Sequence, residues 1–181
     1  MKSGLLVTAG LVLCGGLAWA ASAKAPVPGY PTMAKAELRN TKGEVIGDAR
    51  FVEGPAGVLI SIKAKGLPPG SHGIHIHETG ACDAPKFTSA GGHFHPEKHD
   101  HGFMHATGAH SGDLTNLVVA ADGTVETELL APKVTLQSGT ASLLKPRGTA
   151  LIIHAKADDY KSQPAGDAGD RIACGMITVV K

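Results

Sequence analysis

Short segments in which apolar and polar residues alternate constrain the fold of this chain most strongly. In residues 58–65 (VLISIKAK), the even-numbered positions are apolar and the odd-numbered positions are polar, apart from Leu59. Successive side chains point to opposite faces of a strand, so this segment predicts a strand with one face in the core. No long stretch has a helical period. Further strands are predicted near residues 33–40, 44–53, 72–78, 149–154 and 172–180.

The remaining strands and the connections indicate the fold class. Residues 117–120 and 124–129 flank Asp122-Gly123, a dipeptide that favours tight turns, and predict a hairpin. About eight short strands, 24 glycines and only 4% aromatic residues in 181 predict one all-β domain, an eight-stranded antiparallel barrel or sandwich. Segments 79–113 and 155–171 are too long for ordinary connections, and loops of that length are typically functional or disordered.

The first 23 residues are typical of a secretory signal. Lys2 is the only charged residue, an apolar run extends to Leu17, and A-x-A patterns predict cleavage after Ala20 or Ala23. The alternative, a membrane anchor, requires a longer apolar run. Residues 24–32 form a Pro-rich leader that we expect to be mobile, and residues 33–181 form the predicted folded domain.

The charge of the chain excludes some partners. The whole sequence has 17 basic and 16 acidic residues, and loss of Lys2 with the signal leaves 16 of each. A neutral chain is not a general nucleic-acid binder. After signal cleavage, no segment predicts membrane attachment. Attraction for an anion must therefore come from a local field.

The cysteines fit an exported protein. Cys14 lies in the predicted signal, and a lipoprotein site there is disfavoured because Leu13 occupies a position that requires a small residue. In an oxidising compartment, Cys82 and Cys174 most simply form one disulfide, and two free thiols are the alternative.

Histidines carry the strongest chemical signal. His75 and His77 are two positions apart in a predicted strand and therefore share a face, although such a pair alone is often polar surface. His154 ends another predicted strand, where a lone histidine is more often a hydrogen-bonded strand end. Residues 91–102 (GGHFHPEKHDHG) add four histidines, and His110 and Asp113 follow.

Two kinds of metal fit these groups. Strand histidines form an all-imidazole set that suits copper(II), whereas loop histidines with Asp113 suit tetrahedral zinc. The spacing leaves open whether the two sites share a ligand.

Several motifs together resemble the copper/zinc superoxide dismutases, specifically their exported bacterial branch. They are GIHIHETGACD, SAGGHFHP, HSGDLTNL and HAKADDYKSQPAGDAGDRIACGMI, which follow the family order. The resemblance covers about residue 33 to the C-terminus. The resemblance implies a Greek-key β-barrel of immunoglobulin-like type with two long functional loops. It also implies one copper and one zinc ion per subunit.

The resemblance also assigns roles to residues. It places His75, His77, His93 and His154 on copper, and His93, His101, His110 and Asp113 on zinc, with His93 bridging the two metals. Asp158 corresponds to a carboxylate that links a copper histidine to a zinc histidine, and Arg171 to the arginine that receives the anion. Cys82 and Cys174 correspond to the family disulfide, and His72 to a structural histidine.

His95, His99 and His105 depart from the usual loop. They are either solvated side chains or a weak additional metal-capture site.

The implied activity is the dismutation of superoxide to dioxygen and hydrogen peroxide in the periplasm. His93 would carry a proton, and zinc would keep its ring in place. A copper/zinc storage or delivery module is an alternative that has no need for Arg171, and a zinc-stabilised β-barrel is another that has no need for His154. The family contains monomers and dimers, so a homodimer is compatible with the sequence.

Overall fold

The computed structural model describes residues 33–180, and the predictions for residues 1–32 fall outside this range. The regular elements of the described chain are strands, as predicted, apart from one 3-10 turn, η1, at Thr88–Ala90. The strands are β1 (Met33–Asn40), β2 (Val45–Gly54), β3 (Gly57–Ala64), β4 (Gly70–His72), β5 (Ile74–His77), β6 (Leu117–Val119), β7 (Val125–Ala131), β8 (Ala150–His154), β9 (Arg171–Met176) and β10 (Thr178–Val179).

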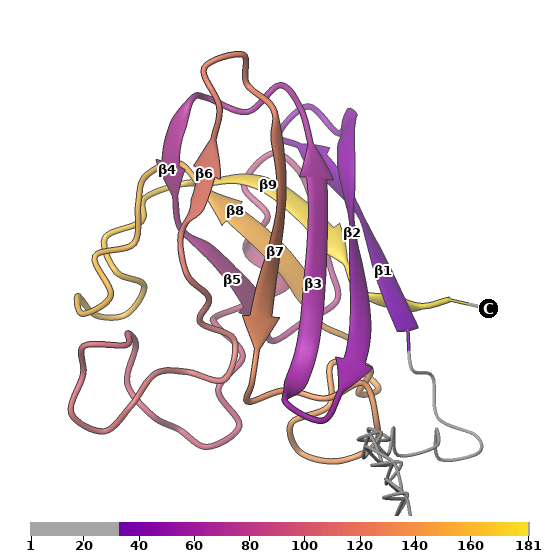
Figure 1. The fold of residues 1–181 in the computed structure, drawn as a ribbon, viewed down its shortest axis with the longest axis vertical. Coiled ribbons are helices and arrows are strands. Elements are labelled where there is room, and N and C mark those ends of the chain that lie inside the picture. Colours follow the sequence, from indigo (N-terminus) through magenta and orange to yellow (C-terminus); the bar gives the residue numbers. More distant parts are fainter. Residues whose placement is uncertain (1–32, 181) are drawn as a thin grey trace, which may run out of the picture.

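The strands pair in one long antiparallel sheet and one short pair. The long sheet has the order β5-β8-β9-β1-β2-β3-β7, with β10 paired to β1, and β4 pairs with β6. The sheet curls so that β5, β8 and β9 lie behind β1, β2, β3 and β7 (Figure 1). Because β7 returns beside β3 after the chain has passed through β4, β5 and β6, the connectivity is that of a Greek-key barrel.

Alternating side chains fill the space between the layers. In β3, Val58, Ile60, Ile62 and Ala64 are buried, so the face predicted from the sequence is the core face. Burial of such side chains is the main driving force for folding. The largest fully buried side chains of the structure are Phe51, Phe87, Leu38, Ile60, Ile62, Ile74, Ile76, Leu114, Leu117, Leu136, Leu143 and Leu151.

Two predicted strands are each divided into two. Segment 72–78 breaks at Gly73, which donates a hydrogen bond to the Lys156 carbonyl (2.7 Å) and accepts one from the His154 N–H (2.8 Å). Segment 172–180 breaks at Ile177, whose N–H donates to the Thr149 carbonyl (3.0 Å). In both places the strand pairing changes: β4 pairs with β6 but β5 with β8, and β9 pairs with β8 but β10 with β1.

The predicted hairpin at residues 117–129 is wrong as a pair of strands. The turn at Asp122-Gly123 forms, with the Ala120 N–H donating to the Thr124 carbonyl (2.9 Å). Beyond it the strands diverge, because β6 pairs with β4 and β7 pairs with β3. The turn is therefore a corner between the two sheets.

The two long connections extend from one side of the barrel and lie near each other (Figure 1). They correspond to the predicted loops 79–113 and 155–171. Within residues 33–180, no helix is long and apolar enough to cross a membrane.

Candidate metal centre

Strands β5 and β8 place three histidines side by side. Along β5, Ile74 and Ile76 point into the core, so His75 and His77 share the opposite face, and all four are buried. His154 ends the neighbouring strand β8. Its ring centroid lies 4.8 Å from that of His75 and 5.7 Å from that of His77.

The first long loop is held against β5 by its backbone. The Phe94 N–H donates to the Ile76 carbonyl, and the Ile76 N–H donates to the Gly112 carbonyl, both at 2.8 Å. A Cβ on Gly112 would lie 2.3 Å from the Ile76 oxygen, so only glycine allows this approach. The arrangement brings His93 beside His75, with 4.0 Å between ring centroids.

The first candidate site contains four buried histidines whose ligand atoms all lie within 4.8 Å of one another. They are His75, His77, His93 and His154. Each ring has one buried nitrogen without a hydrogen-bond partner: Nδ1 of His75 and Nε2 of the other three. Buried polar atoms are rarely left unpaired in proteins. Four such nitrogens in one small space therefore fit a metal ion with imidazole ligands.

The second nitrogens of these rings are fixed by the protein. His75 Nε2 donates to Asp158 Oδ2 (2.7 Å), and the Nδ1 atoms of His77 and His154 donate to the carbonyls of Gly91 (3.0 Å) and Gly169 (3.1 Å). Such partners set the tautomer and the orientation of metal-binding histidines. The free nitrogens are thereby directed at the common space.

A second candidate site surrounds Asp113. Its Oδ1 lies 2.9 Å from His93 Nδ1, 3.1 Å from His101 Nδ1 and 3.3 Å from His110 Nδ1. The Nδ1 atoms of His93 and His110 are 3.3 Å apart. Zinc bonds of 2.0–2.1 Å in a tetrahedron give ligand separations of about 3.3 Å. The four atoms therefore fit a zinc ion.

His75 also lies within 4.8 Å of the ligand atoms of His93, His101 and Asp113. We nevertheless favour His110 as the fourth member of the second site. Both ring nitrogens of His75 are already accounted for, Nε2 by Asp158 and Nδ1 by the first site.

His93 and Asp158 connect the two sites. His93 presents Nε2 to the first site and Nδ1 to the second. Asp158, which is buried, accepts from His75 with Oδ2 and lies 3.0 Å from His101 Nε2 through Oδ1. Each predicted ligand and the predicted linking carboxylate thus lie in one buried cluster.

Burial keeps the rings of the first site neutral. Desolvation lowers the pKa of His75 to about 3 and that of His154 to about 4, and it lowers the pKa values of His77 and His93 as well. A neutral ring offers a lone pair to a metal near neutral pH.

The second site has the opposite electrostatics. Burial alone would lower the pKa of His101, but hydrogen bonds to Asp113 and Asp158 raise it to about 9. Burial alone would raise the pKa of each carboxyl group, but hydrogen bonds from histidines and backbone N–H groups hold both values below the usual range. The two carboxylates are therefore ionised and favour a cation between the rings.

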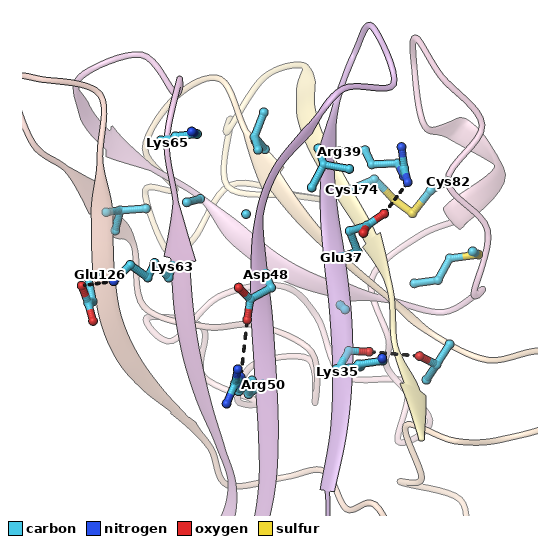
Figure 2. A pocket seen from close by; sticks show the side chains of 18 of the residues that line it. Lys35, Glu37, Arg39, Asp48, Arg50, Lys63, Lys65, Cys82, Glu126 and Cys174 are labelled. Atoms are coloured by element: carbon cyan, nitrogen blue, oxygen red, sulfur yellow. Dashed lines mark hydrogen bonds and ion pairs between the residues drawn. A yellow bond between two sulfur atoms is a disulfide. The ribbon is translucent and has the colours of Figure 1, made fainter. Parts of the chain in front are cut away.

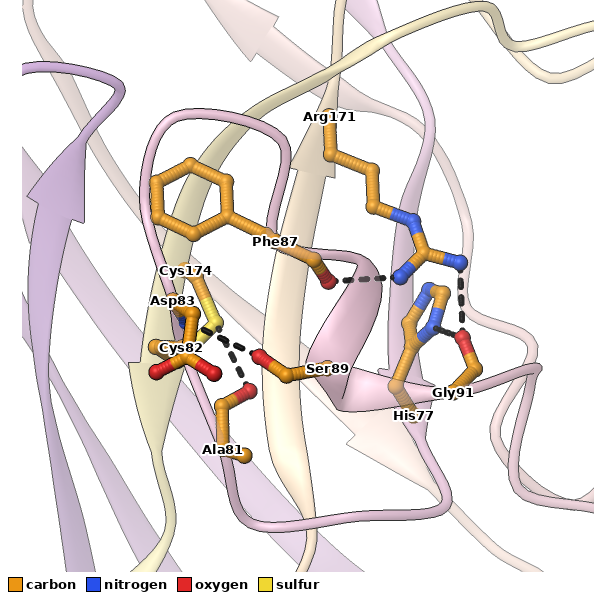
Figure 3. The surroundings of a disulfide bond; sticks show 9 residues. All are labelled: His77, Ala81, Cys82, Asp83, Phe87, Ser89, Gly91, Arg171 and Cys174. Atoms are coloured by element: carbon orange, nitrogen blue, oxygen red, sulfur yellow. Dashed lines mark hydrogen bonds between the residues drawn. A yellow bond between two sulfur atoms is a disulfide. The ribbon is translucent and has the colours of Figure 1, made fainter.

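Figure 3 shows Arg171 beside His77 of the first site, with the disulfide farther from that histidine. The predicted Cys82–Cys174 bond is present and ties the first long loop to β9. Arg171 is partly buried and donates to the carbonyls of Phe87 (2.7 Å) and Gly91 (2.6 Å) in that loop. The Gly91 carbonyl also accepts from His77, so it joins the arginine to a histidine of the first site.

The additional histidines lie outside both groups. His95 is exposed, and its ring centroid lies 4.9 Å from that of His110. His99 Nδ1 is 3.8 Å from Glu97, and His105 Nε2 is 3.5 Å from Asp100. His72 is buried, and both of its ring nitrogens lie 2.8 Å from carbonyl oxygens.

A groove of about 1160 Å³ contains none of the clustered histidines. It lies over the outer face of β1, β2 and β3, with the disulfide at one side (Figure 2). Its charged side chains form exposed pairs such as Lys63 with Glu126 and Arg50 with Asp48. The metal centre, not this groove, therefore has the buried polar groups expected of a reactive site.

Sequence reasoning missed several groups that position the centre. The carbonyls of Gly91 and Gly169 are backbone atoms, so no residue type reveals them. Gln163 and Asn116 bond to the backbones of His101 and Asp158. Both lie within the motifs quoted above, but their partners depend on how the loops fold.

Comparisons with known proteins identify the family. The family model described as copper/zinc superoxide dismutase (SODC) matches residues 45–177. "Superoxide dismutase [Cu-Zn] 2" of Aquifex aeolicus is 53% identical over 146 residues, which cover 80% of this chain and 85% of the relative. "Superoxide dismutase [Cu-Zn]" of Caulobacter vibrioides is 42% identical over 80% of this chain and 84% of the relative.

A solved structure shares the fold. A superoxide-dismutase-like protein from Bacillus subtilis has a TM-score of 0.78 and 42% identity, covering 80% of this chain and 97% of that one. These matches confirm the resemblance seen in the motifs, and the chain belongs to the copper/zinc superoxide dismutase family.

Proposed function

We propose that this protein dismutes superoxide at a copper ion held by His75, His77, His93 and His154. A zinc ion is held by His93, His101, His110 and Asp113. Two superoxide anions and two protons give one dioxygen and one hydrogen peroxide, because one electron passes from the first anion to the second. This activity and these metals are those of the family, and the residue assignments are our proposal.

The unpaired ring nitrogens carry the proposal. Four imidazoles, each anchored through one nitrogen and unpaired at the other, fit copper, whereas three nitrogens and a carboxylate about 3 Å apart fit zinc. When bound, copper supplies one-electron chemistry and zinc a fixed positive charge.

His93 is suited to carry a proton. Its Nδ1 lies beside Asp113 while its Nε2 faces the first site, so the ring can take up a proton at Nε2 without leaving its place. Nε2 then delivers that proton to the second superoxide, and water provides the other. Bound at Nδ1 to the zinc ion, the ring would be held in place during the transfer.

Arg171 attracts and orients the anion. Its guanidinium is fixed by two loop carbonyls and acts on His77 and His154 through its charge. Burial lowers its pKa from the usual value, but an arginine stays protonated near neutral pH. A fixed cation beside the first site raises the local concentration of superoxide.

A storage or delivery module is the less favoured reading. Such a module needs ligands that release the metal, and it has no need for a held cation beside them. The anchored rings and Arg171 support an enzyme instead.

Metal content and superoxide consumption, measured on one purified sample, test the function. We expect one copper and one zinc per chain, and a rate that disappears when copper is removed and returns with copper but not with zinc. A protein that binds copper tightly and consumes no superoxide would support the storage reading.

Export to the periplasm completes the proposal. The apolar run and A-x-A patterns in residues 1–23, together with a disulfide, support a cleaved signal and an oxidising compartment. Sequencing the N-terminus of protein from the periplasmic fraction tests cleavage after Ala20 or Ala23. Residues 33–181 would then be the folded domain. Sedimentation of the mature chain distinguishes a monomer from a homodimer.

A further inference from the structure

Gln163, in the loop between β8 and β9, makes two hydrogen bonds to the backbone of one residue. Its Oε1 accepts from the His101 N–H, and its Nε2 donates to the His101 carbonyl, both at 2.9 Å. We propose that Gln163 is a positioning residue that holds His101 in place for zinc. The inference rests on the proposed function, which assigns His101 to the zinc site.

The backbone of His101 depends on this side chain. Within residues 33–180, its N–H and carbonyl have no hydrogen-bond partner other than Gln163. The surrounding segment consists of turns, and the nearby Phe103 and Met104 are 46% and 75% exposed. The His101 side chain itself is fully buried, and the neighbouring Gly102 N–H donates to Asp113 Oδ2 (2.9 Å), so Gln163 adds the bonds to the His101 backbone that these contacts do not supply.

The ring of His101 must satisfy two partners at once. Nδ1 lies 3.1 Å from Asp113 Oδ1, and Nε2 lies 3.0 Å from Asp158 Oδ1. A small rotation of the backbone would move both nitrogens off their targets. Two bonds from Gln163 to the backbone resist that rotation.

The other end of this contact is held in the same way. The Asp158 N–H donates to Asn116 Oδ1 (2.8 Å), and Asn116 Nδ2 donates to the Asp158 carbonyl (2.9 Å). His101 and Asp158 are thus joined through their side chains, and a side-chain amide fixes the backbone of each. Gln163 completes this arrangement from the second long loop.

The test compares Gln163→Met with Gln137→Met as a matched control. Methionine keeps the length of the side chain and loses the two hydrogen bonds to His101 and the one from Nε2 to the Lys161 carbonyl (3.1 Å). Gln163 is exposed, so the change should not prevent folding, and Gln137 lies in the connection between β7 and β8. Three quantities are measured: zinc release to a chelator, the visible spectrum with cobalt in the zinc site, and the melting temperature of the metal-free oxidised protein.

For Gln163→Met we expect zinc release about 10–100-fold faster and altered cobalt bands, because outer partners of metal ligands typically contribute that much affinity. The melting temperature of the metal-free protein should match that of Gln137→Met, which should release zinc like the unchanged protein. Release within twofold of the control would overturn the inference. So would a lower melting temperature with unchanged cobalt bands, because that pattern indicates only a loop contact.

A His110→Ala variant distinguishes failure of the Gln163 inference from failure of the zinc assignment. If it loses zinc while Gln163→Met behaves like its control, only the role of Gln163 is wrong. If it keeps zinc with an unchanged cobalt spectrum, the zinc assignment fails, and the inference fails with it.

Discussion

At the scale of single residues, burial determines the chemistry of the centre. The same low-dielectric environment that keeps the rings of His75 and His154 neutral would be costly for any polar atom without a partner. Hydrogen bonds fix one nitrogen of each ring, and a metal ion at the proposed copper site would satisfy the other. Folding therefore prepares the site, because a histidine ring cannot set its own tautomer and orientation. Its hydrogen-bond partner in the folded chain sets both.

The metal-free protein should lose stability as the pH falls from about 6.5 to about 4. In that range the unfolded chain protonates His75 and His154, whereas the folded chain, with pKa values of about 3 and 4, does not. The unfolded state then binds more protons, so the free energy of unfolding decreases. His101 has a raised pKa of about 9, so its protonated ring stabilises the folded state fully below pH 6.5. This contribution is lost as the pH rises from 6.5 through 9.

Denaturant unfolding of the metal-free oxidised protein between pH 4 and 9 measures this dependence. A His154→Gln variant is the control, because it should lose part of the decrease between pH 6.5 and 4. Stability that increases on acidification through this range would contradict the burial argument.

Replacing Arg171 should slow anion capture. We expect Arg171→Ala to lower the rate about tenfold or more and to flatten its dependence on ionic strength, because salt screens such fields over about 8–10 Å. Arg50→Ala, which removes the same charge on the outer groove, is the control. If both variants have the same rate and salt slope, Arg171 has no part in capture.

At the scale of elements, the metal centre combines side chains of the barrel strands with side chains of the long loops. β5 and β8 contribute three histidines, and the first loop contributes the other residues of both proposed ligand sets. The loop stays in place through its bonds to β5 and through the disulfide to β9. Loop order and metal binding should therefore depend on each other.

Reducing the Cys82–Cys174 bond should loosen residues 79–113. The bond spans 92 residues, and loss of such a bond typically costs about 2–5 kcal/mol. We expect a lower melting temperature and weaker copper binding. Hydrogen exchange should become faster on reduction, and the increase should be larger in this loop than in β1–β3. An unchanged melting temperature together with unchanged exchange would show that the bridge does not restrain the loop.

The three additional histidines should be dispensable for catalysis. Because both ligand sets are complete without them, changing His95 to Asn, and His99 and His105 to Gln, should leave the rate per bound copper unchanged. Slower metal loading from a dilute, chelated supply would identify a capture role. A several-fold loss of rate in the fully loaded variant would place at least one of them in the active centre.

At the scale of the whole molecule, alternation and motif order were enough to predict a β-barrel with two functional loops. The strand at 58–65 and the shared face of His75 and His77 follow from local periodicity, so they could be predicted. The break at Gly73 and the divergence after Asp122-Gly123 could not, because they depend on partners far away in the chain. The hydrogen bonds of Gln163 are of the same kind.

The predicted ligand residues were found through the family motifs and not through spacing alone. Spacing suggested two metals but left open whether they share a ligand. In the folded protein, His93 presents one ring nitrogen to each group. Only the pairing of the first loop with β5 creates that position.

The most direct test of the central claim is the activity of His154→Ala after full loading with copper and zinc. His154 belongs to the four-histidine group and not to the group around Asp113. The account predicts a folded protein that keeps one zinc per chain and loses most of its superoxide consumption per bound copper. A His72→Gln variant, altered next to His154 but outside both groups, controls for disturbance of the fold. Near-normal activity per copper in His154→Ala would contradict the assignment of this group as the redox centre.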